Sequence, residues 1–583
     1  MIHRLPFVLA LCMLVMAVAI AGNKIQKAQD MQVQVDQPIN TDVSTKITPD
    51  NASPFATPPL GTYTTLSGFY DWQSNGGAAQ HVQVNPANGN IHVVYMLSDD
   101  STSIATSRRS AYAFSSNGGQ TWNNFSNIRI PSRLSGYPNL TLLKGANAGL
   151  PAIANHNIVN SAVGNQCLVY IDSPEGSGAF SELNVPPTVS LSGTLQPIWP
   201  NIAGAADGSI IMAASLNTGA APFFNVRTRT TDLTTWSSWV QYPDTNSPGG
   251  RYPTHANDNG YVGTLRNAGN AGGAWWHASS DNGATWNTPS SQNIYPISPP
   301  GRLSRQDTCR IWVGLDFVWN GNTPLMTLGE QTLATGRNNQ GRILFWSQAT
   351  GFVDVADSSN TPGYVYPLNR AQSNHLTMGW STIGKTGNTL VIVFQAFQRD
   401  TSAAGFNFGD LFYCKSTNLG VTWSAPVNLT NTPNLDERYP SISRWNETGF
   451  INMTWQEDTQ PGSAAFTDNA PLSRARQVFY KLPVPPVGVD EQNGTPNAFH
   501  LSQNYPNPFN PETKIDYRVG QAGLVTIKVY NTLGQEVATL LNENLNPGQY
   551  QVTFAGNNLP SGVYVYKMTA GSYVESKKMV LMK

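Results

Sequence analysis

The chain has 583 residues, too many for one hydrophobic core, so we expect several domains or one large repeat domain with an accessory module. Only 12% of the residues are charged, about half the usual share of roughly 25%, whereas Gly (51), Pro (40), Trp (15) and Tyr (22) are frequent. This composition favours an all-β, turn-rich protein. A formal net charge of -1 gives no electrostatic basis for binding nucleic acid or an anionic membrane, and we expect neither partner.

The N-terminus has the pattern of an export signal. His3 and Arg4 precede an apolar run over 5–21, which ends in the small-residue pattern Ala19-Ile20-Ala21. The alternative is a membrane anchor, but the run is shorter than the ~20 residues of a membrane span and contains Pro6. We therefore expect a signal peptide at 1–21 and no integral membrane segment after its cleavage.

Residues 22–60 are rich in Gln, Asp, Asn, Thr and Pro and show no sustained period, which predicts a flexible leader. The region from 61 to 485 differs from this leader. It contains short apolar runs, for example 91–95 and 389–394, that are bounded by Gly, Asn or Asp, and it lacks long helical periodicity. We expect this region to consist of β-strands.

An aromatic residue followed by proline opens a unit that recurs along this region. Clear copies begin at Trp199-Pro200, Tyr252-Pro253 and Tyr439-Pro440, and weaker ones near His81, Tyr137, Arg310 and His375. The spacing of about 50 to 65 residues fits a four-stranded antiparallel blade. We count seven units, with six as the alternative. The last unit lacks a strand, which residues 62–66 can supply, closing a ring and removing an exposed sheet edge.

A second repeated element has the frame Ser-x-Asp/Asn-x-Gly-x-Thr-Trp. Complete copies occupy 115–122, 279–286 and 416–423, and a shorter copy without the glycine occupies 230–236. The Asp or Asn side chain can stabilise a turn by accepting backbone hydrogen bonds, while Gly supplies a positive φ and Trp packs between strands. We interpret the polar residues as structural and not catalytic: Asn117, Asp232, Asp281 and Asn418. The frame resembles the Asp-box of sialidase-like propellers with BNR repeats, which implies a β-propeller over 61–485.

Three cysteines follow the expected signal peptide and lie far apart in the sequence: Cys167, Cys309 and Cys414. Such a sparse, odd set cannot form a disulfide framework. We expect buried thiols that act as small hydrophobic groups, and a single disulfide is the alternative.

The sequence changes character after a Pro- and Gly-rich stretch at 486–499, which we interpret as a linker. Alternating runs at 515–519, 525–530 and 563–568 predict a small Ig-like β-sandwich at 500–583. The segments 501–511, 529–537, 561–567 and 577–583 resemble the type A C-terminal sorting domain of the type IX secretion system. This resemblance implies recognition by an outer-membrane translocon, and secretion or display on the outer surface of a Gram-negative bacterium.

The propeller resemblance makes sialidase activity the sharpest functional hypothesis. Sialidases use an arginine triad, a tyrosine nucleophile with a glutamate partner, and an aspartate acid/base; their first arginine stands in an aromatic-Arg-Ile-Pro motif ahead of the first Asp-box. Here Arg129-Ile130-Pro131 follows the first box, Ile128 occupies the aromatic position, and after this motif no aspartate appears until Asp172. Only Arg108 and Arg109 precede that box within the propeller. These departures disfavour a sialidase.

Four residues could reach a central funnel, but they form no recognisable catalytic constellation, and we expect them at the surface: Glu330, Glu437, Arg438 and Tyr439. The eight histidines are scattered without ligand spacing, so we predict no metal, no cofactor and no identifiable catalytic residue. Trp275-Trp276 could stack on sugar rings, although we expect core packing. The predicted function is surface recognition, with glycans as candidate ligands. The alternative is a glycoside hydrolase of the sialidase-like superfamily with a non-standard active site.

Overall fold

The computed structural model divides the chain into two compact units, Met1–Pro486 and Val487–Lys583. It describes residues 60–74, 80–123, 129–130, 134–160, 164–188, 196–216, 224–242, 252–267, 274–286, 292–293, 309–332, 340–364, 377–465, 470–484, 499–504, 506–519, 523–545, 548–571 and 573–582. The expected signal peptide at 1–21 lies outside these residues, as do the leader and the linker apart from Leu60 and Phe499.

The first unit contains seven antiparallel sheets within its described residues, six of four strands and one of five. Numbered in chain order, sheets one to three contain β2 (Val82–Val84), β3 (Ile91–Leu97), β4 (Arg109–Ser115) and β5 (Arg129–Ile130); β6 (Ser135–Leu142), β7 (Pro151–Asn160), β8 (Gly164–Asp172) and β9 (Phe180–Glu182); and β10 (Pro197–Gly204), β11 (Ile210–Leu216), β12 (Phe224–Thr230) and β13 (Val240–Gln241).

Sheets four to six contain β14 (Thr254–Ala256), β15 (Val262–Asn267), β16 (Ala274–Ser279) and β17 (Gln292–Asn293); β18 (Cys309–Ile311), β19 (Asp316–Asn320), β20 (Thr323–Thr332), β21 (Gly341–Ser347) and β22 (Gly351–Ala356); and β23 (Met378–Thr386), β24 (Thr389–Thr401), β25 (Asn407–Ser416) and β26 (Val427–Asn428). The seventh sheet joins the two ends of the unit: β27 (Asp436–Ile442), β28 (Phe450–Asp458), β29 (Ala475–Pro483) and β1 (Thr62–Gly68).

Strand β1 supplies the missing strand of the last sheet, as the sequence predicted. It pairs antiparallel with β29, with Thr62 opposite Phe479 and Ser67 opposite Arg476. The hydroxyl of Thr64 also donates a hydrogen bond of 2.9 Å to Oε1 of Gln477. The first strand and the last sheet of the unit are therefore joined by a seam.

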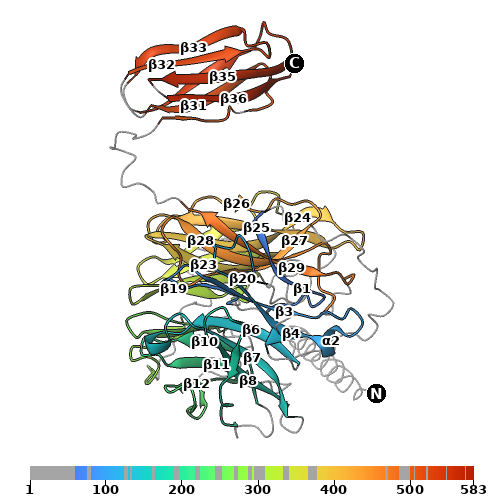
Figure 1. Cartoon of the computed structure of the whole chain (residues 1–583), viewed down its shortest axis with the longest axis vertical. Helices are drawn as coiled ribbons and strands as arrows, with labels where there is room; N and C mark the ends of the chain where they lie inside the picture. Colours follow the sequence, from blue (N-terminus) through green and yellow to red (C-terminus); the bar gives the residue numbers. More distant parts are fainter. Residues whose placement is uncertain are drawn as a thin grey trace, which may run out of the picture. The chain divides into compact units, whose positions relative to one another are not determined.

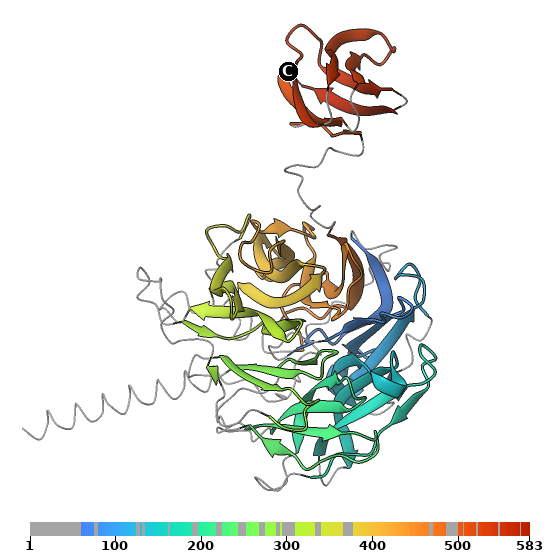
Figure 2. The ribbon, with the colours of Figure 1, turned by 90° about the vertical axis from the view of Figure 1, so that its left-hand side faces the viewer.

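Each sheet packs against the next through a separate apolar core. These cores join the seventh sheet to the first, the first to the second, and so on through the sixth and seventh. Figure 2 shows the sheets following one another around a common centre, with the blue β1 beside the orange β29. The sequence of cores thus returns to its starting point.

Stacking on both faces explains the composition of strands in the middle of the sheets. The strand β3 reads IHVVYML and β11 reads IIMAASL, and every residue in both strands is buried. A strand covered on both faces needs no alternation of polar and apolar residues, and β-branched residues fit the pleated surface well. Within the described ranges the helices are short, α2 (Ile104–Ser107) and the 3-10 turn η3 (Gly145–Asn147), and no helix is long and apolar enough to cross a membrane.

The three complete Ser-x-Asp/Asn-x-Gly-x-Thr-Trp segments, called box turns below, share one hydrogen-bond pattern. In the copy at 279–286, the amide of Gly283 donates to the Ser279 hydroxyl (2.9 Å), and the amide of Thr285 donates to Oδ1 of Asp281 (2.8 Å). The same bonds recur in the other two copies at distances of 2.8 to 3.0 Å. Every oxygen of the Asp or Asn is engaged by its own turn, which agrees with a structural role.

The box turns also occupy equivalent places between sheets. Trp122 lies against Phe479 of the preceding sheet with ring centroids 5.5 Å apart, and Trp423 lies against Phe345 at 5.2 Å. The remaining complete copy, at 279–286, contacts the preceding sheet through Gly283, which lies against Ile211. The box turns are therefore equivalent corners of the first, fourth and sixth sheets.

The second unit consists of two sheets that enclose one core (Figure 1). The three-stranded sheet contains β30 (His500–Leu501), β31 (Glu512–Val519) and β34 (Gly548–Ala555); the four-stranded sheet contains β33 (Glu536–Leu545), β32 (Gly523–Tyr530), β35 (Gly562–Ala570) and β36 (Tyr573–Leu581). Strands β32 and β35 alternate between buried and more exposed residues, so the predicted period of two is confirmed there.

None of the three cysteines forms a disulfide, which excludes the disulfide alternative among them. Cys167 and Cys414 are buried, as expected, and burial raises the pKa of both thiols. Cys309 is only partly buried.

Candidate functional site

One strand of each sheet faces the centre of the first unit. These inner strands are β2, β6, β10, β14, β19, β23 and β27, and each contacts the next in this order until β27 contacts β2. All seven run in the same sense, because each precedes its partner strand in the same kind of hairpin. Residues at equivalent places along these strands therefore form layers across the central axis.

Aromatic residues form the first layer. Tyr137, Trp199, Trp380 and Tyr439 have φ values of 53° to 55°, at points where the register of the inner strand shifts against its neighbour. Such values are costly for bulky residues and persist only where the surroundings hold them. The Trp380 and Tyr439 rings lie 4.8 Å apart, and Trp72, from the segment after β1, lies within 6.2 Å of both. All residues of this layer are buried except Tyr137, which is partly buried.

A layer of polar side chains follows two residues further along the inner strands. Asn139 donates a hydrogen bond of 3.1 Å to Oδ1 of Asn201, which joins the second and third sheets. The hydroxyl of Ser441 accepts from the amide of His81 (2.9 Å), which joins the seventh and first sheets. Thr382 occupies the same place in the sixth sheet and donates to Asp316 of the fifth. We call this layer the polar belt.

Beyond the polar belt, where the inner strands turn into their hairpins, lies a cavity of about 760 Å3. Residues from all seven sheets line it. Many of them carry side-chain amides: Gln80, Gln83, Asn85, Asn257, Asn259 and Asn446. Two tryptophans, Trp319 and Trp445, also line the cavity. We call it the axial cavity.

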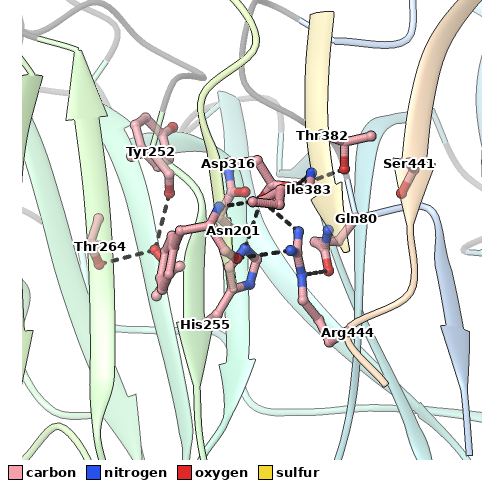
Figure 3. A network of polar contacts seen from close by, with 12 residues as sticks. Gln80, Asn201, Tyr252, His255, Thr264, Asp316, Thr382, Ile383, Ser441 and Arg444 are labelled. Carbon is pink, nitrogen blue, oxygen red and sulfur yellow. Dashed lines mark hydrogen bonds and ion pairs between the residues drawn. The ribbon is translucent and has the colours of Figure 1, made fainter. Parts of the chain in front are cut away.

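Asp316 is the centre of the polar network beside this cavity. Its side chain is fully buried, and its Oδ1 accepts hydrogen bonds from Nη2 of Arg444 (2.7 Å), Nε2 of His255 (3.2 Å) and its neighbour's amide. Its Oδ2 accepts from the Thr382 hydroxyl (2.7 Å) and the amide of Ile383 (3.2 Å). Figure 3 shows these side chains converging on Asp316 from separate strands. Five donors thus satisfy one carboxylate.

The charges of this network are fixed by their surroundings. The Arg444 guanidinium and the His255 hydrogen bond outweigh burial and hold the pKa of Asp316 below its usual range. Burial, followed by the charge of Arg444, lowers the pKa of His255 to about 4. At neutral pH the carboxylate is therefore ionised, and the neutral imidazole donates its Nε2 proton. This saturated Asp316 cannot act as a proton donor at neutral pH.

Arg444 spans from the last sheet to the fifth. Besides Asp316, its guanidinium donates to the carbonyl of Phe317 (2.9 Å) and to Oε1 of Gln80 (2.5 Å). Lys144, a second cation of the cavity, pairs with Asp258 at 2.7 Å. Lys385, the third, has no ion-pair or hydrogen-bond partner for its ammonium within the described part of the chain. Its pKa is lowered by partial burial.

The four residues expected at the surface are buried instead, and that prediction is wrong. Glu330 accepts a hydrogen bond of 2.9 Å from Nε of Arg342, and Nε of Arg438 lies 2.7 Å from Oδ2 of Asp436. Glu437 accepts from the hydroxyls of two threonines, and Tyr439 belongs to the aromatic layer. Partners of opposite charge or polarity make this burial tolerable. None of the four lines the axial cavity.

The residues weighed for sialidase chemistry do not meet at the cavity either. Arg129 lies in β5, at the opposite end of its sheet from the inner strand β2. The guanidinium of Arg108 lies over the rings of Tyr70 and Tyr137, at 5.8 Å and 6.0 Å from their centroids. Asp172 accepts hydrogen bonds from the loop that follows it. Trp276 packs edge-on against Phe317 and Trp319, which confirms core packing for this ring.

Sequence reasoning missed the residues that build the site. Asp316, His255, Arg444 and Lys385 form no motif, since they lie on four sheets and meet only through the fold. One signal was present. The polar residue after an aromatic-Pro pair, in Trp199-Pro200-Asn201 and in Tyr439-Pro440-Ser441, is a member of the polar belt.

These features define the first unit as an all-β protein of the propeller type with a polar site on its axis. The family model described as secretion system C-terminal sorting domain matches residues 503–582. The protein is therefore exported by the type IX secretion system and is secreted or held at the cell surface. Comparison with curated proteins gives no match.

Solved structures similar to this chain include three carbohydrate-active proteins. An α-L-arabinanase from Penicillium chrysogenum in complex with arabinobiose is 11% identical with a TM-score of 0.38, and the match covers 73% of this chain and 98% of that one. An ulvan lyase is 11% identical with a TM-score of 0.41, over 72% and 96%. A Hadza microbial sialidase is 11% identical with a TM-score of 0.35, over 72% and 68%. We draw no conclusion about activity from likenesses this distant.

Proposed function

We propose that this protein is an exported carbohydrate-recognition propeller that binds its ligand in the axial cavity. The observation that carries this proposal is the lining of that cavity: side-chain amides and two tryptophans surround about 760 Å3, a volume suited to a small ligand or part of a larger one. Export to the cell surface puts such a site in contact with extracellular polymers.

The chemistry of the lining suits sugars. Each Asn or Gln amide offers donors and acceptors at once, which matches hydroxyl groups that also do both. Trp445 is 37% exposed and presents an aromatic surface on which the apolar face of a sugar ring can lie. The buried network around Asp316 fixes the Arg444 guanidinium in place, so part of the site is organised before binding.

The same lining disfavours glycoside hydrolysis in this cavity. Glycosidases generally place two carboxyl groups about 5 to 9.5 Å apart on either side of the bond that is cleaved. Asp258 is the one carboxylate among the described lining residues, and it is 92% exposed and paired with Lys144. Asp316 is buried behind the lining and engaged by five donors. Binding without turnover is therefore the function that this geometry supports.

We further propose that the seven sheets are the blades of a closed seven-bladed propeller over 61–485, followed by a linker at 486–499 and an Ig-like sandwich at 500–583. The cyclic order of the apolar cores and the pairing of β1 with β29 support the seven-bladed ring over the six-bladed alternative. A signal peptide at 1–21 remains part of this proposal, and mass determination of the secreted N-terminus tests it.

A panel of plant, algal and bacterial polysaccharides tests the proposed function. The full chain is titrated with each polysaccharide, and the supernatant is assayed for new reducing ends. We expect binding that Trp445→Ala weakens by about tenfold and that Trp346→Ala, away from the cavity, leaves within about twofold. Release of oligosaccharides by the wild type, or no binding to any polysaccharide, would contradict the proposal.

A further inference from the structure

The cations of the axial cavity are not equivalent. Arg444 is neutralised by Asp316 at 2.7 Å, and Lys144 is neutralised by Asp258, also at 2.7 Å. Lys385 has no carboxylate within ion-pair distance among the described residues. The acid on the adjoining hairpin, Glu447, pairs with Lys481. One uncompensated positive charge therefore remains in the lining.

Partial burial makes that charge costly. Lys385 is partly withdrawn from water at the end of β23, and burial disfavours its charged form, as the lowered pKa shows. A charge in such a place is stabilised when an opposite charge approaches it. The described part of the chain supplies no such carboxylate, so an anionic ligand that enters the cavity would stabilise the charge.

The position of Lys385 is fixed relative to Trp445. The hydroxyl of Thr386 donates to the carbonyl of Glu447 (2.8 Å) and accepts from the amide of Gly449 (3.0 Å). Nδ2 of Asn446 reaches the carbonyl of Lys385 at 3.5 Å. These bonds hold the hairpin after β23 against the hairpin after β27, so Lys385, at the end of β23, and Trp445, on the neighbouring hairpin, line the same part of the cavity.

We infer that the ligand of the axial cavity is an acidic carbohydrate, whose anionic substituent pairs with Lys385 while a sugar ring lies against Trp445. This inference rests on the proposed function and adds the class of ligand to it. The anionic group is a carboxylate, sulfate or phosphate ester, since each of these pairs with an ammonium in the same way. The amide side chains around the cavity then bind the hydroxyl groups.

Matched pairs of probes separate charge from sugar recognition. The full chain is titrated with oligogalacturonate and its neutral methyl ester, with a sulfated galactan oligosaccharide and its desulfated form, and with inorganic sulfate alone. We expect an acidic probe to bind at least about tenfold more tightly than its neutral partner, and we expect this preference to shrink as salt is added.

Three variants locate the charge. Lys385→Gln is expected to abolish the preference for the acidic probe, Lys385→Arg to keep most of it, and Lys415→Gln, at an exposed lysine outside the cavity lining, to change it by less than about twofold. Thermal unfolding of each variant establishes that it is folded. Which acidic probe binds identifies the anionic group as a carboxylate or a sulfate.

Two outcomes overturn the inference in different ways. Equal binding of acidic and neutral probes, unchanged in Lys385→Gln, would overturn the acidic ligand and leave carbohydrate recognition standing. Binding of inorganic sulfate alone, or of no probe at all, would overturn carbohydrate recognition itself and the inference with it.

Discussion

Nη2 of Arg444 lies 2.7 Å from Oδ1 of Asp316, although the two residues are 128 positions apart in the sequence. Arg444 follows the inner strand of the seventh sheet, and Asp316 begins the inner strand of the fifth. The two sheets are not neighbours, so this contact bridges the axis over the sixth sheet. The contact therefore joins the seventh sheet to the fifth beside the axial cavity.

Removing the carboxylate of Asp316 should destabilise the first unit. In Asp316→Ala the Arg444 charge stays partly buried without its partner, and five donors lose their acceptor, which costs about 3 to 5 kcal/mol in similar cases. Asp316→Asn keeps one acceptor oxygen and should cost less. All 15 tryptophans precede residue 487, so tryptophan fluorescence during denaturant unfolding reports on the first unit alone.

The exposed carboxylate Asp258 provides the matched control for this experiment. Its side chain is 92% exposed and pairs with Lys144 at the surface, and such pairs contribute about 0 to 1 kcal/mol. We expect Asp258→Asn to unfold at nearly the wild-type denaturant concentration. If Asp316→Ala were equally stable, the network would not support the fold.

The box turns offer a test within a single turn. Gly118 and Gly119 have φ values of +72° and +83°, but a Cβ added to Gly118 meets nothing within 4 Å, whereas one added to Gly119 meets Phe479 at 2.4 Å. Gly118→Ala should cost about 1 to 2 kcal/mol from backbone strain. Gly119→Ala should cost about 1 to 3 kcal/mol more, because the methyl group overpacks the contact between sheets.

A double-mutant cycle isolates the second effect. If overpacking is its cause, Gly119→Ala combined with Phe479→Leu should be less destabilised than the sum of the two single changes, and Gly118→Ala combined with Phe479→Leu should be additive. The free energy of unfolding from fluorescence is the measured quantity. Additivity in both cycles would contradict the proposed contact between the first box turn and the last sheet.

The repeats predicted the sheets because each depends on local chemistry. A box turn is held by bonds among residues of one short segment, such as those between Ser279, Asp281 and Thr285, and these are visible as a pattern in the sequence. The closing strand β1 could be predicted because an unpaired sheet edge is unfavourable, whichever residues form it.

The axial site could not be predicted in the same way. Asp316 acquires its role only from Arg444, His255 and Thr382, which come from other sheets and share no spacing. The prediction for Arg438 was wrong for a different reason: it placed at the surface a residue that is fully buried. A run of charged residues normally indicates a solvated surface, but here the compensating carboxylate is Asp436, two residues earlier on the same buried strand.

The buried acid Asp436 should make stability depend on pH. Burial raises its pKa to about 7, despite the nearby Arg438 and the amide of Gly409. Because the folded state holds the proton more tightly than the unfolded state, this group favours folding below its unfolded pKa, and that contribution is lost as pH rises through about 7. Wild-type stability should therefore decrease relative to Asp436→Asn between about pH 4 and pH 8.

Between pH 4 and pH 8, the free energy of unfolding of the wild type should fall relative to that of Asp436→Asn by on the order of 2 to 4 kcal/mol, since one pKa unit corresponds to about 1.4 kcal/mol. Unfolding of both proteins at several pH values gives the difference directly, and subtraction removes histidines such as His255, whose lowered pKa acts in the opposite sense. A difference that is constant from pH 4 to pH 8 would show that Asp436 does not exchange its proton on unfolding.

The seam between β1 and β29 joins the two ends of the first unit within the described residues. Ser67 and Arg476 lie opposite each other there, and neither is fully buried. Directly opposed residues of antiparallel strands have Cα atoms about 4.5 to 5.5 Å apart, which suits a disulfide. Ser67→Cys combined with Arg476→Cys should therefore link the seam covalently.

If separation of β1 precedes unfolding of the ring, the oxidised double variant should resist denaturant more than its own reduced form, by about 2 to 4 kcal/mol. The reduced form is the control for the loss of the contact between Arg476 and the ring of Tyr63, whose centroid lies 5.7 Å from the guanidinium carbon. Equal stability of the two forms, with the disulfide verified by mass determination, would mean that the ring opens elsewhere. In that case the seam would not limit the stability of the first unit.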